Sequence, residues 1–237
     1  MISPLLTLMV SPLLLQVQAG VTCNHRDYFE TQIEVEVDKK RINYIRDTTL
    51  GELQNRLKST LYKRQKEMGT NAYLSDEDVD PVGLSISGST SADIAFDTDI
   101  NFLALPQNPE NTRYCLIFKS VTVNVSYHTN MTIAKDLKEG DCAYDAVLKH
   151  QMKHHHANEK VVDTLVEKLR GDLPSILVGL EQSYVAKKAV GHSYGEMTTG
   201  LQDALAPYQE NMDALINEYA AFIDTPEELE ALADSCK

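Results

Sequence analysis

The chain has 237 residues, with 22 Lys and Arg against 35 Asp and Glu, which gives a formal net charge of −13 at pH 7. This acidic balance argues against nucleic acid and anionic lipid as partners, because both require clustered positive charge. The length suffices for one large domain or two small ones, and beyond residue 19 no apolar run approaches the about 20 residues of a membrane span.

The first nineteen residues contain no charged side chain. An apolar stretch from Leu5 to Leu15 is followed by small residues ending at Ala19, which is typical of a secretory signal peptide. No Lys or Arg precedes this stretch and Pro12 interrupts it, so a retained membrane anchor is the alternative. We expect residues 1–19 to be a signal peptide, and the mature chain to be secreted or periplasmic and to have no transmembrane helix.

The region 20–135 has the patterns of a sheet. Residues 32–38 alternate apolar and polar side chains, which predicts a strand with one buried face. Residues 92–105 are predicted to form two strands in succession, and residues 114–127 one longer strand with the same alternation. These segments indicate a mostly antiparallel sheet.

One helix and one loop are predicted between the first two of these strands. Leucines at 50, 53, 57 and 61 share one helical stripe that follows a cap at Asp47 and ends near Gly69. Residues 73–91 lose this periodicity and carry the acidic cluster 76–80, which indicates a loop. A calcium site there is the alternative, although the spacing of an EF-hand loop is absent.

The region 136–237 has helical patterns instead. Apolar and histidine side chains recur every three or four residues from 141 to about 170, and further helices are predicted over 173–188 and 198–223, the last kinked at Pro207. The run Asp224-Thr-Pro-Glu-Glu228 is typical of a final helix start. The expected fold class is therefore α+β, with a sheet-rich region and a helical region that either stand apart or form one domain.

Four widely spaced cysteines are present: Cys23, Cys115, Cys142 and Cys236. None forms a C-x-x-C pair, so a zinc ribbon or a thioredoxin-like centre is not expected. In an exported protein an even number favours two disulfides, for which three connectivities exist. Four buried thiols are the alternative.

Four of the seven histidines fall within residues 150–156. His150 and His154 are one helical turn apart on the inward stripe, where both imidazoles can reach one metal ion. Two buried rings also need partners for their polar atoms, and a shared metal satisfies both. We therefore predict that His150 and His154 bind metal, with Zn²⁺ as the expected ion. His155 and His156 are expected to be solvated.

The residue after the first histidine argues against catalysis. In the zinc-protease pattern H-E-x-x-H this position holds a glutamate that accepts a proton from the metal-bound water. This chain has Gln151, whose amide cannot take that proton, and general-base catalysis is worth about 10² to 10⁴ in rate. Hydrolysis is expected to be lost unless Glu stands at 151 or another carboxylate, such as Glu159 or Glu196, substitutes. Whether the chain is an enzyme stays open.

The stretch from Asp141 to His154, together with Ile223–Glu228 and Cys236, resembles a bacterial family of uncharacterised secreted proteins described as zinc-dependent-protease-like. The resemblance covers roughly the second half of the chain. It implies a zincin-like metallopeptidase acting on a peptide or protein, with His150 and His154 as zinc ligands and position 151 as the catalytic base.

Catalytic zinc usually has three protein ligands and a water. His192, which follows a predicted loop, is our preferred third ligand. Glu159 is the alternative, although nine residues past His150 it points to the opposite side of a straight helix.

Two other functions compete with a zincin-like protein. A binding or structural protein of the cell envelope would use the histidines for packing and hold no metal. A metal-buffering protein would use His150, His154, His155 and His156 to hold several ions weakly.

Overall fold

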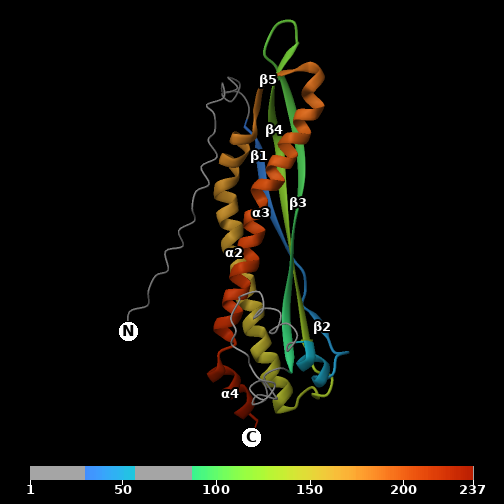
Figure 1. The fold of residues 1–237 in the computed structure, drawn as a ribbon, viewed down its shortest axis with the longest axis vertical. Helices are drawn as coiled ribbons and strands as arrows, with labels where there is room; N and C mark the ends of the chain where they lie inside the picture. The colour runs from blue at the N-terminus through green and yellow to red at the C-terminus, as the bar shows by residue number, and fades with distance from the viewer. Residues whose placement is uncertain (1–29, 57–86, 237) are drawn as a thin grey trace, which may run out of the picture.

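The computed structural model describes residues 30–56 and 87–236. The strands are β1 (Gln32–Lys39), β2 (Asn43–Ile45), β3 (Gly88–Pro106), β4 (Arg113–Ile133) and β5 (Gln182–Ala186). The helices are α2 (Cys142–Leu180), α3 (Val190–Ile223) and α4 (Pro226–Asp234), with a 3-10 turn, η2, at Lys187–Ala189 and a further helix over residues 50–56. The long strands and long helices run along one axis, so the molecule is elongated (Figure 1).

β4 is the central strand of a single mixed sheet. β3 and β5 pair with it in antiparallel fashion, whereas β1 and β2 pair with it in parallel. The predicted α+β class is confirmed at this level, because the structure combines a sheet with C-terminal helices. The expectation of a mostly antiparallel sheet missed the two parallel partners, since strand direction is not encoded in the alternation of side chains.

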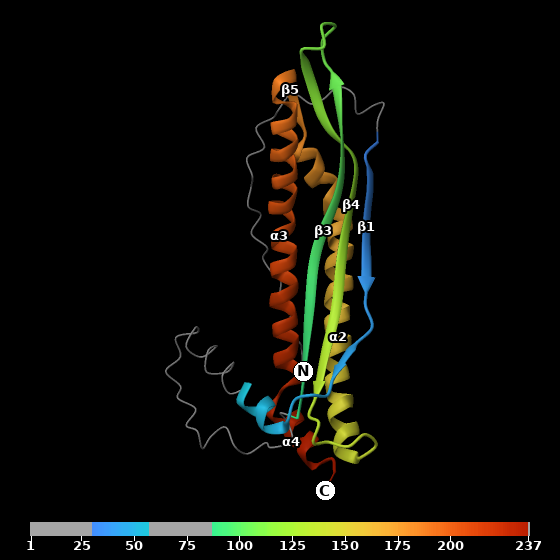
Figure 2. The same ribbon diagram turned by 90° about the vertical axis from the view of Figure 1, so that its right-hand side faces the viewer.

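α2 and α3 cover one face of this sheet (Figure 2). Every second residue of β4 from Val121 to Tyr127 is fully buried toward them, as its alternation predicts. The largest apolar cluster joins these strand residues to side chains of β1, α2, α3 and β5. The sheet-rich and helical regions therefore share one core.

The helical region contains a strand that the sequence pattern did not predict. Residues 173–188 were expected to be a helix, but α2 continues through Pro174 to Leu180, and β5 follows at once. β5 pairs with residues 113–116 of β4, about seventy positions earlier in the chain. This long-range pairing overrides the local helical pattern.

Other element boundaries also differ from prediction. β3 is one strand with a register shift between Asn101 and Phe102, where two strands were expected, and it begins at Gly88, inside the predicted loop. α3 begins eight residues before the predicted start and runs through Pro207. The helix start at residues 224–228 is confirmed, because Thr225 caps α4 by accepting from the Glu228 amide and Pro226 follows it.

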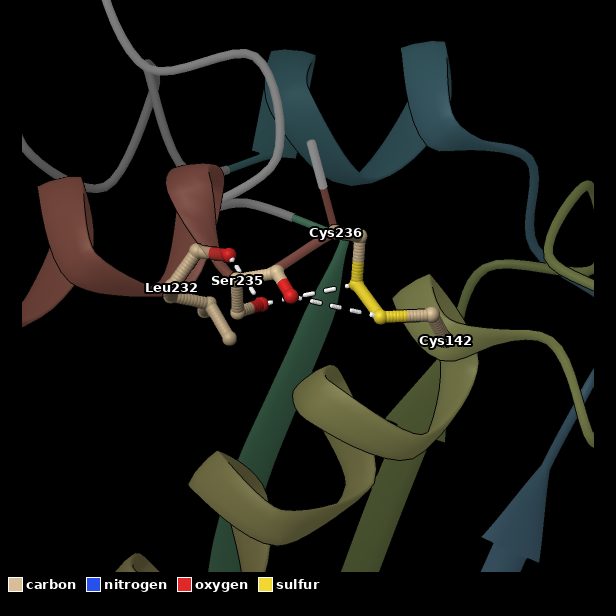
Figure 3. Close-up of a disulfide and its surroundings, with 4 residues drawn as sticks. All are labelled: Cys142, Leu232, Ser235 and Cys236. Atoms are coloured by element: carbon tan, nitrogen blue, oxygen red, sulfur yellow. Dashed lines mark hydrogen bonds between the residues drawn. A yellow bond between two sulfur atoms is a disulfide. The ribbon is translucent and has the colours of Figure 1, made fainter.

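A disulfide fastens the C-terminus to the start of α2. Cys142 and Cys236 are bonded, with their Cα atoms 5.7 Å apart. The Ser235 hydroxyl beside them donates to the Leu232 carbonyl at 2.7 Å and closes the last turn (Figure 3). Cys115 is also disulfide-bonded. The prediction of disulfides is thus confirmed for these three cysteines.

Several predictions fall outside the described residues. They concern the signal peptide at 1–19, Cys23, the helix beyond residue 56 and the acidic loop at 76–80. Within the described part of the chain, no helix combines the length and apolar character needed to cross a membrane.

Candidate metal centre

His150 and His154 lie in the first half of α2, at the end of the molecule where α4 packs (Figure 1). His150 is 3% exposed and His154 is 8% exposed. The two Nε2 atoms are 3.3 Å apart, and the ring planes are inclined by 75°. The helical spacing therefore brings both imidazoles to one point, as predicted.

Asp224 completes the group from another part of the chain. Its Oδ1 lies 3.0 Å from the Nε2 of His150 and 3.0 Å from the Nε2 of His154. Asp224 directly follows α3, and its backbone amide donates to the Ala220 carbonyl, which fixes its position at the helix end. The three side chains together form a group that can hold a metal ion.

The spacing of the three atoms suits a tetrahedral ion. Two ligand atoms that each lie about 2.0–2.1 Å from a tetrahedral zinc are about 3.3–3.4 Å apart. The observed separations of 3.0, 3.0 and 3.3 Å are close to that edge. Two imidazoles and one carboxylate are also a common donor set for zinc, so the residues fit this ion in kind and in spacing.

The carboxylate of this group is held in its charged form. Burial works to raise the pKa of Asp224, but hydrogen bonds and charge from His150 and His154 outweigh it and hold the pKa well below the ordinary value. The Asp224 side chain is 46% exposed, so one side of the group is open to solvent. It thus offers a charged ligand atom beside an accessible face.

A further carboxylate lies behind His150. The Nδ1 of His150 is buried and has no hydrogen-bond partner among the described residues, and Glu228 Oε1 lies 3.9 Å from it. Glu228 belongs to α4 and forms an ion pair with Lys153, which lowers the pKa of its carboxyl. Carboxylates in this position orient metal-binding histidines by accepting from the second ring nitrogen.

The disulfide holds this arrangement from the side. Cys142, which is bonded to Cys236 (Figure 3), is two helical turns before His150 on α2, and Cys236 ends the segment that begins at Asp224. The segment from Asp224 to Cys236 is therefore attached to the rest of the fold at both ends. This restraint keeps Glu228 and Asp224 near the histidines.

Gln151 is part of a packing contact. It is 3% exposed, and its Oε1 accepts a hydrogen bond from the Thr90 hydroxyl at 2.9 Å. A Cβ at Gly88 would lie 2.7 Å from Val147 and 3.0 Å from Gln151, so β3 approaches α2 closely here. The position expected for a catalytic base thus holds a neutral amide that is hydrogen-bonded to β3.

Glu159 does not join the histidine pair. Its Oε2 lies 3.6 Å from His155 Nε2 and 3.6 Å from His156 Nδ1. The expectation that His155 is solvated is wrong, because this residue is 8% exposed and packs on β4, where burial lowers its pKa. His156 is solvated as expected, with its side chain 66% exposed.

His192 is also far from the pair. It stands in the first turn of α3, 32 residues before Asp224, which is about 48 Å along a helix. Its side chain is 79% exposed, and its Nε2 lies 3.4 Å from Glu196. The structure therefore brings neither His192 nor Glu196 to the site, and it brings Asp224 beside the two histidines instead.

Asp224 was not predicted as a ligand from the sequence. It is 70 residues beyond His154, and its local pattern was interpreted as a helix start alone. Asp224 does lie within Ile223–Glu228, one of the segments on which the family resemblance is based. This resemblance is the one sequence signal that pointed to Asp224.

Comparison with known proteins found no relative of this chain: no protein-family model, curated protein or solved structure matches it.

Proposed function

We propose that this protein binds one zinc ion through His150, His154 and Asp224, in the manner of the zincin-like family that its sequence resembles, and that it does not hydrolyse peptides. The observation that carries the proposal is the triangle of two Nε2 atoms and one Oδ1 atom, with its near-tetrahedral edges.

The protonation pattern of the histidines supports a metal over a purely structural cluster. Without a metal, neutral rings that both donate from Nε2 to the same Asp224 oxygen leave a lone pair on His150 Nδ1. That nitrogen is buried, and the Glu228 carboxylate lies 3.9 Å from it. With zinc on Nε2, the proton stands on Nδ1 and can be donated toward Glu228. Metal binding therefore supplies partners for both ring nitrogens.

The same residues argue against hydrolysis. A bound zinc ion supplies Lewis acidity and an activated water. The residues that would have to accept the proton of that water are unsuited to it, because Gln151 is a neutral amide engaged with Thr90 and Glu228 is engaged with Lys153. Zinc in this chain then serves to hold the C-terminal segment and to present an open coordination position to a peptide or protein ligand.

The Cys142–Cys236 disulfide is compatible with the expected secreted or periplasmic location, because such bonds persist in oxidising compartments. It also fixes one end of the segment that carries Asp224. We therefore place the metal-bound protein outside the cytoplasm.

The test is a zinc titration of the full chain by calorimetry, with His154→Ala as the variant and His192→Ala as the matched control. We expect the tight site to be lost in His154→Ala and kept in His192→Ala. The absence of tight zinc binding in the unmodified protein would leave the cluster as a structural hydrogen-bond network.

A peptidase assay tests the second half of the proposal. The zinc-loaded protein is expected to be inactive on unstructured peptides. Unlike the expectation from the sequence, Gln151→Glu is expected to stay inactive, because the side chain at 151 contacts Thr90 on β3. It is expected to lose about 1–3 kcal/mol of stability, because it places a charge in a buried packing position. Turnover by the unmodified chain would contradict the non-catalytic assignment.

A further inference from the structure

A second group of metal-ligating side chains lies on α2, directly after the first. His155, His156 and Glu159 each offer one ligand atom, and these atoms all lie within 4.8 Å of one another. Glu159 Oε2 is 3.6 Å from a nitrogen of each histidine, which is too long for a hydrogen bond. The carboxylate therefore lies between two imidazoles without a direct bond to either.

His155 is fixed in place by the sheet. Its Nδ1 lies 2.9 Å from the Thr129 hydroxyl, which donates its own proton to the Tyr127 oxygen at 2.8 Å. Tyr127 in turn donates to the backbone carbonyl of His155 at 3.4 Å. With the Thr129 proton used in this way, its oxygen is left to accept from His155, and this network favours the tautomer with the ring proton on Nδ1.

This tautomer has a consequence for the other side of the ring. In this tautomer Nε2 of His155 carries a lone pair, and the Oε2 atom of Glu159 lies 3.6 Å from it. Two electron-rich atoms thus face each other at the edge of a buried ring, with the Nδ1 of His156 beside them. A cation placed between these atoms removes the repulsion and uses all three as ligands.

We propose that His155 Nε2, His156 Nδ1 and Glu159 form a second divalent-metal site, separate from the His150, His154 and Asp224 group. The hydrogen bond from His155 to Thr129 gives this site the outer support that metal-binding histidines commonly have. Donors of two imidazoles and one carboxylate suit zinc, copper and nickel.

The second site binds more weakly than the first. The side chains of His156 and Glu159 are 66% and 31% exposed, so both exchange freely between water and metal. The nearby Lys39 cation, which opposes a metal, is held by Asp163, with Nζ 2.8 Å from Oδ1. The site is thus open to solvent and keeps free coordination positions for water or for a partner's side chain.

The experiment is a zinc titration of the full chain, with the number of ions per chain read by native mass spectrometry. The unmodified protein is expected to bind two. His156→Ala and Glu159→Gln are each expected to bind one and to keep the tight site. The matched control is Glu196→Gln, because His192 and Glu196 form a similar helical pair that belongs to neither group of candidate ligands found in the described residues. This variant is expected to bind two ions.

A third variant tests the role of the sheet. Thr129→Val removes the acceptor for His155 Nδ1 and leaves every ligand in place, so the second site is expected to weaken by about 10- to 100-fold. Binding of a single ion by the unmodified protein overturns the proposal. So does a second ion that persists in both His156→Ala and Glu159→Gln. Loss of the tight ion in His154→Ala reports on the first site alone, so the two proposals fail separately.

Discussion

The two halves of α2 bury different kinds of side chain. From Val161 to Leu177 every buried residue is aliphatic and belongs to the main core. From His150 to Asn158 every buried residue is polar, and three are histidines. Buried polar groups cost stability unless they are satisfied, whereas buried aliphatic groups supply it. The aliphatic half of the helix therefore stabilises the fold, and the polar half carries side chains of the candidate metal group.

The largest expected effect comes from the aliphatic half. Leu169→Ala truncates a fully buried leucine and is expected to lower the free energy of unfolding by about 2–5 kcal/mol. The zinc stoichiometry of the folded protein should not change. Urea unfolding followed by a zinc titration checks both statements. Loss of the metal in this variant would contradict the claim that the two halves of α2 have separate roles.

The next effect concerns the polar half. Zinc at about 100 times its dissociation constant is expected to stabilise the protein by about 2.7 kcal/mol. Asp224→Asn keeps an oxygen that can accept from both histidines but removes the charge, so most of this stabilisation should disappear. Thermal unfolding with and without zinc measures it. Equal stabilisation of both proteins would show that Asp224 is not a ligand.

A further prediction concerns the role of Glu228 beside His150. Glu228→Gln is expected to weaken zinc binding by about 10- to 100-fold, because His150 loses its carboxylate partner. Lys153→Met is the matched control, since it breaks the same ion pair and leaves the carboxylate in place. Equal weakening in both variants would point to the ion pair as the cause.

The smallest expected effect comes from a contact between α2 and α3. The Tyr208 hydroxyl donates to Asp172 at 2.6 Å, and hydrogen bonds from Lys168 and Tyr208 lower the pKa of Asp172. Tyr208→Phe is expected to cost about 0.5–1.5 kcal/mol at neutral pH, a modest value because Asp172 is partly exposed.

The pH dependence of this contact has a definite sign. Because the folded-state pKa of Asp172 is lowered, its contribution is present above the ordinary value of 3.8 and is lost as the pH falls through the folded-state pKa. The difference in stability between the two proteins should therefore shrink below about pH 4. Urea unfolding across this range measures it, and a constant difference would contradict the role of the ionised carboxyl.

Local patterns predicted the parts of the fold that depend on local physics. The alternation in β1 and β4 gave strands because one face of each is buried, and the capping residues at Thr225 and Pro226 gave the start of α4. The pairing of His150 with His154 follows from helical spacing alone. These features need no information about distant residues.

The missed features all depend on contacts between distant residues. β5 is a strand because β4 offers it a free edge, and His155 is buried because Thr129 and Tyr127 lie opposite it. Asp224 reaches the histidines only because α3 runs back along α2 and ends beside them. His192 was favoured because it follows a predicted loop that could fold back, but it lies in the first turn of α3, at the other end of this helix from Asp224.

The central claim is that His150, His154 and Asp224 bind zinc. Its most direct test is extended X-ray absorption fine structure at the zinc edge, measured on the Glu159→Gln variant loaded with one zinc per chain, because this variant isolates the first site. Our account predicts two imidazoles and oxygen ligands at about 2.0–2.1 Å, and no zinc retained at this site when His154→Ala is added. A spectrum with a single imidazole, or one unchanged by His154→Ala, would contradict the assignment of His150, His154 and Asp224 as the metal centre.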